Sequence, residues 1–444
     1  MLERNIQPHT SPISSINIPE PEKIITPNGV EIFQLNLGDQ DVFRIDVIFG
    51  AGKWEQKKNL VAMFTNLLLK EGVEGMSALE VAEHLDYYGA WLQPSATYHN
   101  SYVTLYSLNK YAKETLSLVE KIIKKPLFNE HEFDVIRNRR KQSFLVEEEK
   151  VQVVAFNNFI EAIFGKVHPY GKHASASDFD ILNTDDLKEF HKKYYNSSNC
   201  KIVITGKITD EIMDYVINAF GKEQWGGMLV KDRLCEQETS DDKDVSNNEL
   251  FCNYENSYKP KEIFVEKADA MQSAIRIGMP VINRNHPDYA KLRILNTLLG
   301  GYFGSRLMAN IREEKGYTYG IGSNITTLKN GSYITISTQT AVNYTQEVIK
   351  EVFNEIRKLK EELVTDEEMS MLKGYLMGEM ARLFDGPFPI ADAHISLIAN
   401  GMDSGYYKNM IKEISDITSG DIIEMAKKYF IENNFSVIIS GKKE

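Results

Sequence analysis

The chain lacks the features that mark membrane-spanning proteins and disulfide-stabilised secreted domains. No apolar run approaches the roughly 20 residues of a membrane-spanning helix, and the N-terminal segment has no apolar core typical of a signal peptide. The three cysteines are odd in number and widely spaced, which indicates free thiols in a reducing compartment. We therefore expect a cytoplasmic protein, or a periplasmic one if a signal has been removed, with no membrane partner.

The chain also has fewer basic than acidic residues. Lys and Arg total 51 against 63 Asp and Glu, and the formal net charge is −12. Nucleic-acid binding needs a basic face that displaces counterions, so we expect no nucleic-acid partner. The 42% hydrophobic and 26% charged residues are typical of a globular protein, and 444 residues are too many for one ordinary core. Two or more domains are therefore expected.

The chain does contain a duplicated unit. Residues 186–206 show the pattern of an amphipathic helix followed by an apolar strand, and residues 421–441 repeat it 235 residues later without a gap. A hydroxyl side chain at the same offset, Thr184 and Ser419, predicts the N-cap of each helix. We expect two tandem domains of similar fold.

The segment between the halves predicts a linker. Residues 235–249 are polar, acidic and aperiodic. We place the N-terminal domain at 15–225, the linker at 226–261 and the C-terminal domain at 262–444. Alternating strands and long helices occur in both halves, which favours an α+β fold in which each domain is a mostly antiparallel sheet covered by helices.

Several elements can be given bounds from local patterns. Capping boxes at Ser77–Glu80 and Thr365–Glu368 predict helix starts. Strands are predicted at 102–107 and 331–337. Further helices are predicted at 110–124, 130–148, 151–164, 286–299, 305–315, 344–359 and 365–383.

Residues 59–72 form a predicted helix whose frame and surroundings resemble a known family. Taken alone, this segment is an ordinary core helix with an apolar stripe. With residues 43–55 before it and 168–172 after it, the segment resembles the first helix of the pitrilysin-like zinc peptidases, the family of insulinase and mitochondrial processing peptidase. The resemblance covers nearly the whole chain, including the duplication.

The resemblance also indicates what this chain has lost. The family carries an inverted H-x-x-E-H motif on this helix, in which two His bind zinc and the Glu polarises a water. Here the three positions are Ala62, Thr65 and Asn66, and the family's distal glutamate ligand falls at Gln142. None of the nine histidines forms a helical i, i+4 pair. We expect no metal and no catalytic residue in this chain, and zinc only in a catalytic partner.

Residues 300–319 are close to the family's C-terminal signature. The resemblance implies that Arg312 and Tyr319 contact the substrate near the scissile peptide, where both can donate to an oxygen that gains charge. Alone, an Arg in a last helical turn favours the helix dipole and a Tyr is common in strands. The family's flexible gate loop corresponds to Gly300, Gly301 and Gly304. No G-K-[ST] follows these glycines, which argues against a phosphate-binding loop.

These observations predict a non-catalytic subunit of a heterodimeric zinc peptidase. The expected partner is a paralogue with an intact H-x-x-E-H motif, although a homodimer stays open, and the expected substrate is an extended peptide held partly by strand addition. One alternative is a purely structural paralogue within a larger complex. Another is an enzyme of unrecognised chemistry, for which the sequence offers no ligand set.

Overall fold

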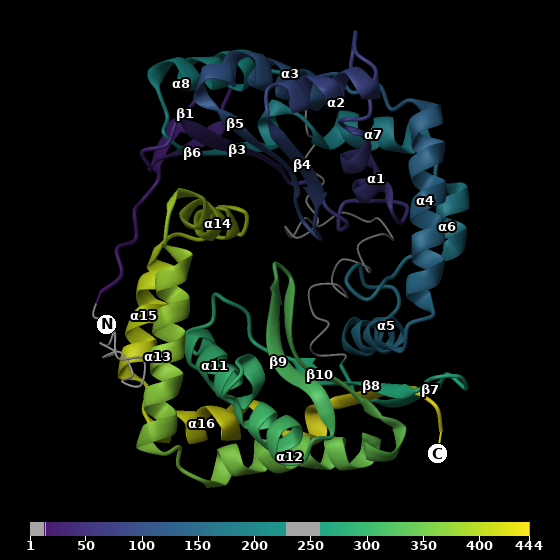
Figure 1. Cartoon of the computed structure of the whole chain (residues 1–444), viewed down its shortest axis with the longest axis vertical. Helices are drawn as coiled ribbons and strands as arrows, with labels where there is room; N and C mark the ends of the chain where they lie inside the picture. Colours follow the sequence, from purple (N-terminus) through teal and green to yellow (C-terminus); the bar gives the residue numbers. More distant parts are fainter. Residues whose placement is uncertain (1–12, 14, 228–257, 444) are drawn as a thin grey trace, which may run out of the picture.

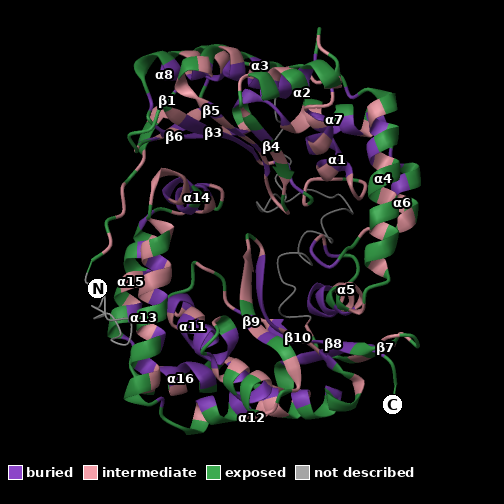
Figure 2. Cartoon of the chain, in the orientation of Figure 1, coloured by how far each residue is buried: buried purple, intermediate pink, exposed green. Residues whose placement is uncertain are grey.

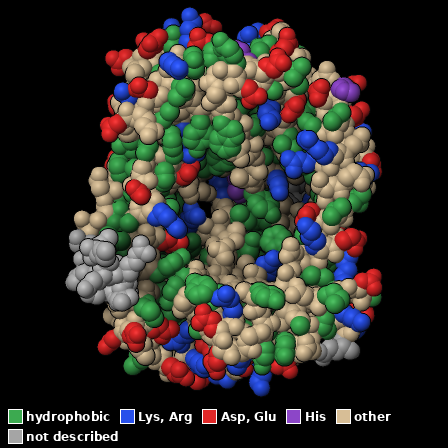
Figure 3. Space-filling view, viewed as in Figure 1, with side chains coloured by type: hydrophobic (Ala, Val, Ile, Leu, Met, Phe, Trp, Pro, Cys, Tyr) green, Lys and Arg blue, Asp and Glu red, His purple; other side chains and the backbone are tan. Residues whose placement is uncertain are grey.

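The computed structural model describes residues 13, 15–227 and 258–443, and has two similar halves (Figure 1). Each half is built on one sheet with helices on its outer face, and the predicted α+β class is confirmed. The surface is hollowed between the halves (Figure 3). The predicted linker at 226–261 lies outside the described residues except for 226–227 and 258–261.

The first sheet has the strand order β1-β2-β6-β3-β5-β4 and is antiparallel except between β2 and β6. Strand β5 alternates buried and half-buried side chains, as the sequence predicts for a strand with one buried face. The strands are β1 (Glu22–Ile25), β2 (Glu31–Asn36), β3 (Val42–Phe49), β4 (Trp91–Ala96), β5 (Ser101–Leu108) and β6 (Cys200–Gly206).

The second sheet has the order β7-β11-β8-β10-β9 and is antiparallel except between β7 and β11. Its last two strands form a long hairpin that points toward the first half (Figure 1). The strands are β7 (Glu262–Glu266), β8 (Gln272–Pro280), β9 (Thr318–Leu328), β10 (Gly331–Ala341) and β11 (Ser436–Gly441).

The helices of the first half cover the outer face of its sheet (Figure 1). Helices α4 and α5 have the predicted bounds. The helices are α1 (Val61–Leu68), α2 (Ala78–Tyr87), α3 (Ala112–Lys124), α4 (Glu130–Glu148), α5 (Val151–Phe164), α6 (Ala176–Ile181), α7 (Thr184–Tyr194) and α8 (Asp210–Val216).

The second half repeats this plan with two π-helical segments. The predicted helix at 286–299 begins only at Tyr289 and becomes π-helical at residues 297–301, and the predicted helix at 305–315 is π-helical from Met308 to Glu314. The α-helices are α11 (Tyr289–Asn296), α12 (Thr345–Glu361), α13 (Asp366–Leu383), α14 (Pro387–Ile398), α15 (Gly405–Asp416) and α16 (Ser419–Tyr429).

The duplicated helices α7 and α16 start one residue earlier than predicted. Asn183 and Thr418, not Thr184 and Ser419, are the N-caps, and each forms a capping box with an aspartate three residues later. The caps still lie 235 residues apart, so the repeat holds. The capping box predicted at Thr365 is incomplete because the Glu368 carboxylate pairs with the Arg306 guanidinium at 2.9 Å instead of turning back to its cap.

Each half supplies a helix to the other half's sheet. Helix α5 packs its buried aromatic side chains, including Phe159 and Phe164, against Tyr333 and Ile438 of the second sheet. Helix α14 packs Ile390 and its neighbours against β6 and β3 of the first sheet. Both helices lie between the sheets and bury one side (Figure 2). The two halves therefore share apolar cores.

Candidate functional site

Helix α1 holds three of the four positions that bind zinc or activate water in the resembling family. Ala62 and Thr65 are 0% exposed and Asn66 is 1% exposed. The Ala62 N–H donates to the Gln56 side chain at 3.2 Å, so the preceding loop folds over the start of the helix. The three side chains face packed protein and present no surface to a substrate.

Asn66 forms structural hydrogen bonds in this buried setting. Its Nδ2 donates to the Ser95 carbonyl of β4 at 3.0 Å and to the Tyr195 hydroxyl at 3.2 Å. The second half has the same arrangement, since Asn296 on α11 donates from Nδ2 to the Ser323 carbonyl of β9 at 3.2 Å. In both halves an asparagine side chain links a helix to an edge strand of the sheet by a hydrogen bond. Asn66 therefore does for the first half what Asn296 does for the second.

The fourth position, Gln142, lies on an exposed face of α4. No hydrogen bond within the described ranges joins it to α1. Across residues 13, 15–227 and 258–443, no group of three or more His, Cys, Asp or Glu is arranged to hold a metal ion. The same stretches contain no helix long and apolar enough to cross a membrane.

Arg312 lies in the π-helical segment Met308–Glu314, one turn before Gly316, whose φ of 64° ends the helix. Its guanidinium lies 4.8 Å from the centroid of the Phe303 ring. The nearest acidic oxygen belongs to the adjacent Glu313, at 3.9 Å, too far for a hydrogen bond. An aromatic face thus positions Arg312 and leaves its donors available.

Tyr319 is 93% exposed at the start of β9, the edge strand of the second sheet. The register explains this exposure: Thr338 pairs with Ile321 and Thr340 with Thr318, so β9 has one extra residue here. Such a β-bulge bends the strand and re-aims its side chain. The bulge was not predicted from the sequence, although Gly320 in the middle of a strand pattern is a signal for one.

Two threonine hydroxyls hold the bulge together. Thr318 Oγ1 donates to the Gln339 carbonyl at 2.6 Å, and Thr338 Oγ1 lies 2.9 Å from both Thr318 Oγ1 and the Gly320 carbonyl. These bonds replace the ladder contacts that the extra residue disrupts. The orientation of Tyr319 is therefore fixed by the backbone beneath it.

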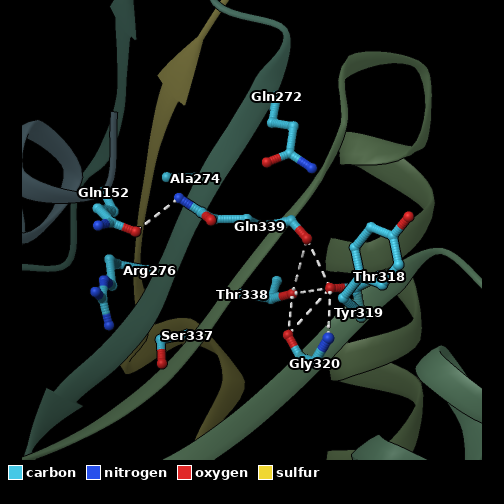
Figure 4. A pocket seen from close by; sticks show the side chains of 10 residues that line it. All are labelled: Gln152, Gln272, Ala274, Arg276, Thr318, Tyr319, Gly320, Ser337, Thr338 and Gln339. Atoms are coloured by element: carbon cyan, nitrogen blue, oxygen red, sulfur yellow. Dashed lines mark hydrogen bonds between the residues drawn. The ribbon is translucent and has the colours of Figure 1, made fainter. Parts of the chain in front are cut away.

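Tyr319 forms one end of a pocket of about 270 Å³ on the second sheet (Figure 4). Arg276 of β8 lies at the opposite end, and side chains of β10 lie between them. Arg312 does not line this pocket, so the structure places the two predicted substrate-binding residues on adjoining but separate surfaces. The lining residues are Gln152, Gln272, Ala274, Arg276, Thr318, Tyr319, Gly320, Ser337, Thr338 and Gln339.

The three predicted gate glycines have different surroundings. Gly300 is buried, and a Cβ there would lie 2.7 Å from the Ser323 backbone nitrogen, so glycine is needed for close packing on β9. Gly301 and Gly304 are exposed, and a Cβ on either would meet side chains only. Close backbone approach is therefore required at Gly300 and serves the packing of its own half.

The histidines nearest the hollow belong to an aromatic cluster that joins the halves. His99 Nε2 and the Tyr170 hydroxyl lie 2.5 Å apart, and the Asn330 N–H at the β9–β10 turn donates to the same hydroxyl at 3.0 Å. Burial, with a smaller contribution from Lys329, lowers the pKa of His99 to about 4. His168 is buried beside Phe164, as expected for a structural residue.

Comparison with known proteins agrees with this geometry. Residues 182–376 match the family model described as the peptidase M16 inactive domain. The chain resembles the M16 peptidase family. The matched region contains Arg312, Tyr319 and the three glycines, and it excludes α1.

M16 relatives resemble the chain over nearly its full length. A Bacillus subtilis protein described as the uncharacterized zinc protease YmxG is 22% identical over 430 residues, covering 93% of this chain and 96% of its own. A Helicobacter pylori protein described as the non-peptidase homolog YmxG is 22% identical over 409 residues, covering 89% of this chain and 88% of its own. The crystal structure of a peptidase M16 inactive domain from Pseudomonas fluorescens has a TM-score of 0.81 at 22% identity, covering 96% of this chain and 98% of its own, and shares the fold.

Proposed function

We propose that this M16 chain is the non-catalytic subunit of a heterodimeric zinc peptidase, in which it binds the substrate and encloses half of the chamber. The observation that carries the proposal is the contrast between α1 and β9. The three positions on α1 are buried and Asn66 is hydrogen-bonded to β4, whereas Tyr319 is 93% exposed on a bulge that directs it outward. A chain that keeps hydrogen-bond donors for a substrate but lacks a metal site can contribute to catalysis when a partner chain supplies the metal.

The expected substrate is an extended peptide. The edge strands β4 and β9 each pair on one side only, and an unpaired strand edge can add a peptide as a further strand. Strand β4 contains Pro94, which has no N–H to offer at an edge. Strand β9 carries Tyr319 and contains no proline, so it is the better edge for peptide addition.

In this assembly Arg312 and Tyr319 would act on a substrate whose scissile peptide lies at the partner's zinc. A guanidinium and a phenol can donate hydrogen bonds to a carbonyl oxygen as it gains negative charge. Arg312 is free to do so because its guanidinium rests on Phe303 rather than on a carboxylate.

The test is turnover by the reconstituted complex. Tyr319→Phe removes one donor and almost no volume, so we expect normal folding and assembly with a roughly 10- to 1000-fold loss of turnover, the scale of a lost oxyanion donor. Arg312→Ala should cost at least as much, because a charge-assisted donor is lost. Tyr344→Phe, a half-exposed tyrosine of the same half outside the pocket, is the matched control.

Assembly is followed by gel filtration alongside each turnover measurement. Neither substitution should disturb it, because two side chains cannot carry a standard-sized interface. Normal turnover in both variants would contradict the proposal and favour a purely structural paralogue.

A further inference from the structure

The pocket that ends at Tyr319 contains an arginine with no acidic partner. Arg276 of β8 is half-buried, and its guanidinium lies 5.6 Å from the centroid of the Phe156 ring of α5. No ion pair to Arg276 is present in the described part of the chain, and no Asp or Glu lines the pocket. Desolvation lowers the pKa of Arg276, because burial disfavours its charged form.

Pairing with a carboxylate is the usual arrangement for a guanidinium withdrawn from water. Buried Arg44 forms a bidentate pair with Asp46 and contacts Asp392, and half-buried Arg306 forms a bidentate pair with Glu368. Arg276 has no such carboxylate among the described residues, and it faces the pocket that ends at Tyr319.

The remaining polar lining of the pocket is neutral. Gln152 from α5 and Gln339 from β10 are joined by a hydrogen bond of 2.9 Å (Figure 4). Gln272 lies four residues before Arg276 on β8, and Ser337 of β10 is paired with Arg276. Amides and hydroxyls can donate hydrogen bonds to an anion without repelling it.

We infer that Arg276 and its neighbours bind a carboxylate of the peptide substrate. The inference rests on the proposed function and specifies the substrate class: peptides that carry either a free C-terminal carboxylate or an Asp or Glu side chain near the cleavage point. A planar guanidinium binds a carboxylate through two parallel hydrogen bonds.

The geometry also sets the distance from that carboxylate to Tyr319. Arg276 is on β8 and Tyr319 on β9, with β10 between them, and neighbouring strands are about 5 Å apart. The two residues are also offset along the strands, because Arg276 pairs with Ser337 and Ser337 pairs with Gly322, three residues from Tyr319. The combined separation is roughly 12–14 Å, which an extended peptide spans with about four residues at about 3.3 Å each. The carboxylate should lie about four residues from the group that Tyr319 contacts.

The test measures binding of matched fluorescent peptides to the full chain and to the heterodimer by anisotropy. The reference peptide is neutral and amidated, a second has a free C-terminus, and a third is amidated with one Gln replaced by Glu. At least one carboxylate peptide should bind roughly 10- to 100-fold tighter than the reference, the scale of a hydrogen-bonded charge pair. Comparison of the two distinguishes a terminal from a side-chain carboxylate.

Arg276→Gln should abolish this preference, so that the carboxylate peptides bind no more tightly than the reference peptide. Arg276→Lys should retain part of the preference, because lysine keeps the positive charge but lacks the planar guanidinium that donates two parallel hydrogen bonds. Arg357→Gln, which removes an exposed arginine from α12, should retain all of it. Circular dichroism checks that each variant is folded, and the wild-type comparison among peptides stands even if Arg276→Gln does not fold.

Two outcomes would overturn the inference and are distinguishable from failure of the proposed function. Equal affinity for all three peptides, or a preference that persists in Arg276→Gln, rejects the carboxylate site while leaving peptide binding intact. Absence of binding by every peptide, to the chain and to the heterodimer alike, rejects the proposed function together with the inference.

Discussion

At the scale of single residues, burial decides what the side chains of α1 can do. Ala62, Thr65 and Asn66 are buried, and the Asn66 amide donates hydrogen bonds to the Ser95 carbonyl and the Tyr195 hydroxyl. The sequence predicted the loss of the zinc ligands, because residue identity alone shows it. It could not predict that Asn66 bonds the edge strand, since this depends on a contact between residues far apart in the chain.

We expect that restoring the motif would cost stability before it gained metal. Ala62→His, Thr65→Glu and Asn66→His insert larger polar groups into a packed site, at about 1–3 kcal/mol for each overpacked position. Tight zinc binding should also need Gln142→Glu, because two ligands hold zinc weakly. Thermal unfolding and metal analysis after dialysis measure the two effects.

The matched control is Asn296→His, which breaks the equivalent hydrogen bond in the second half without building a zinc site. It should lower stability and bind no zinc. If the triple variant held one zinc as tightly as the quadruple variant, the placement of the distal ligand at Gln142 would be wrong.

We predict that the stability of the protein depends on pH through the carboxyl group of Glu55. Burial raises the pKa of this carboxyl from 4.5 to about 7, although it accepts a hydrogen bond from the Gly52 N–H at 2.8 Å. Because the folded pKa exceeds the unfolded one, the favourable contribution of the protonated group is complete below pH 4.5 and is lost as the pH rises through 7.

We therefore expect Glu55→Gln to stabilise the protein more at pH 8 than at pH 5, by about 1–2 kcal/mol. Urea unfolding of both proteins at the two pH values measures the difference. Glu83→Gln, on an exposed position of α2, should leave the pH dependence unchanged. An equal effect of Glu55→Gln at both pH values would show that Glu55 ionises freely.

At the scale of elements, helix bounds were predictable and packing partners were not. Helices α4 and α5 have strong local signals, including the Asn129 cap of α4, and both have the predicted bounds. The local sequence does not show that α5 packs on the second sheet. Its hydrophobic periodicity predicts an apolar helix face but not which element packs against that face. The π-helical turns and the β9 bulge were missed because they arise from packing and register.

Helix α5 should link the stability of the two halves. Phe159 is 0% exposed and lies against Tyr333 and Gly278 of the second sheet. Phe159→Ala should destabilise the protein by about 3–5 kcal/mol. Hydrogen exchange should accelerate in β8 and β10 of the second sheet, although the substitution is in the first half of the sequence.

Phe156→Ala on the same helix is the control. That side chain is 37% exposed, so its loss should cost far less than the loss of Phe159. Faster exchange in Phe159→Ala confined to the first sheet would contradict the shared core.

At the scale of the whole molecule, the duplication seen in the sequence becomes two sheets, one in each half (Figure 1), and the surface between the halves is hollowed (Figure 3). The family and the α+β class were predicted and are confirmed, because both depend on patterns that extend over the whole chain. The pocket between Arg276 and Tyr319 could not be predicted, since its lining comes from α5 and three strands that only the fold brings together.

The central claim is that this chain contributes substrate binding and its partner contributes the metal. The most direct measurement is zinc content and peptide turnover of the purified chain, alone and mixed with an M16 chain that has an intact H-x-x-E-H motif. We predict that the chain alone holds far less than one zinc and cleaves nothing, and that the mixture cleaves peptide with one zinc per heterodimer. A stoichiometric zinc and peptide cleavage in the chain alone would contradict the account.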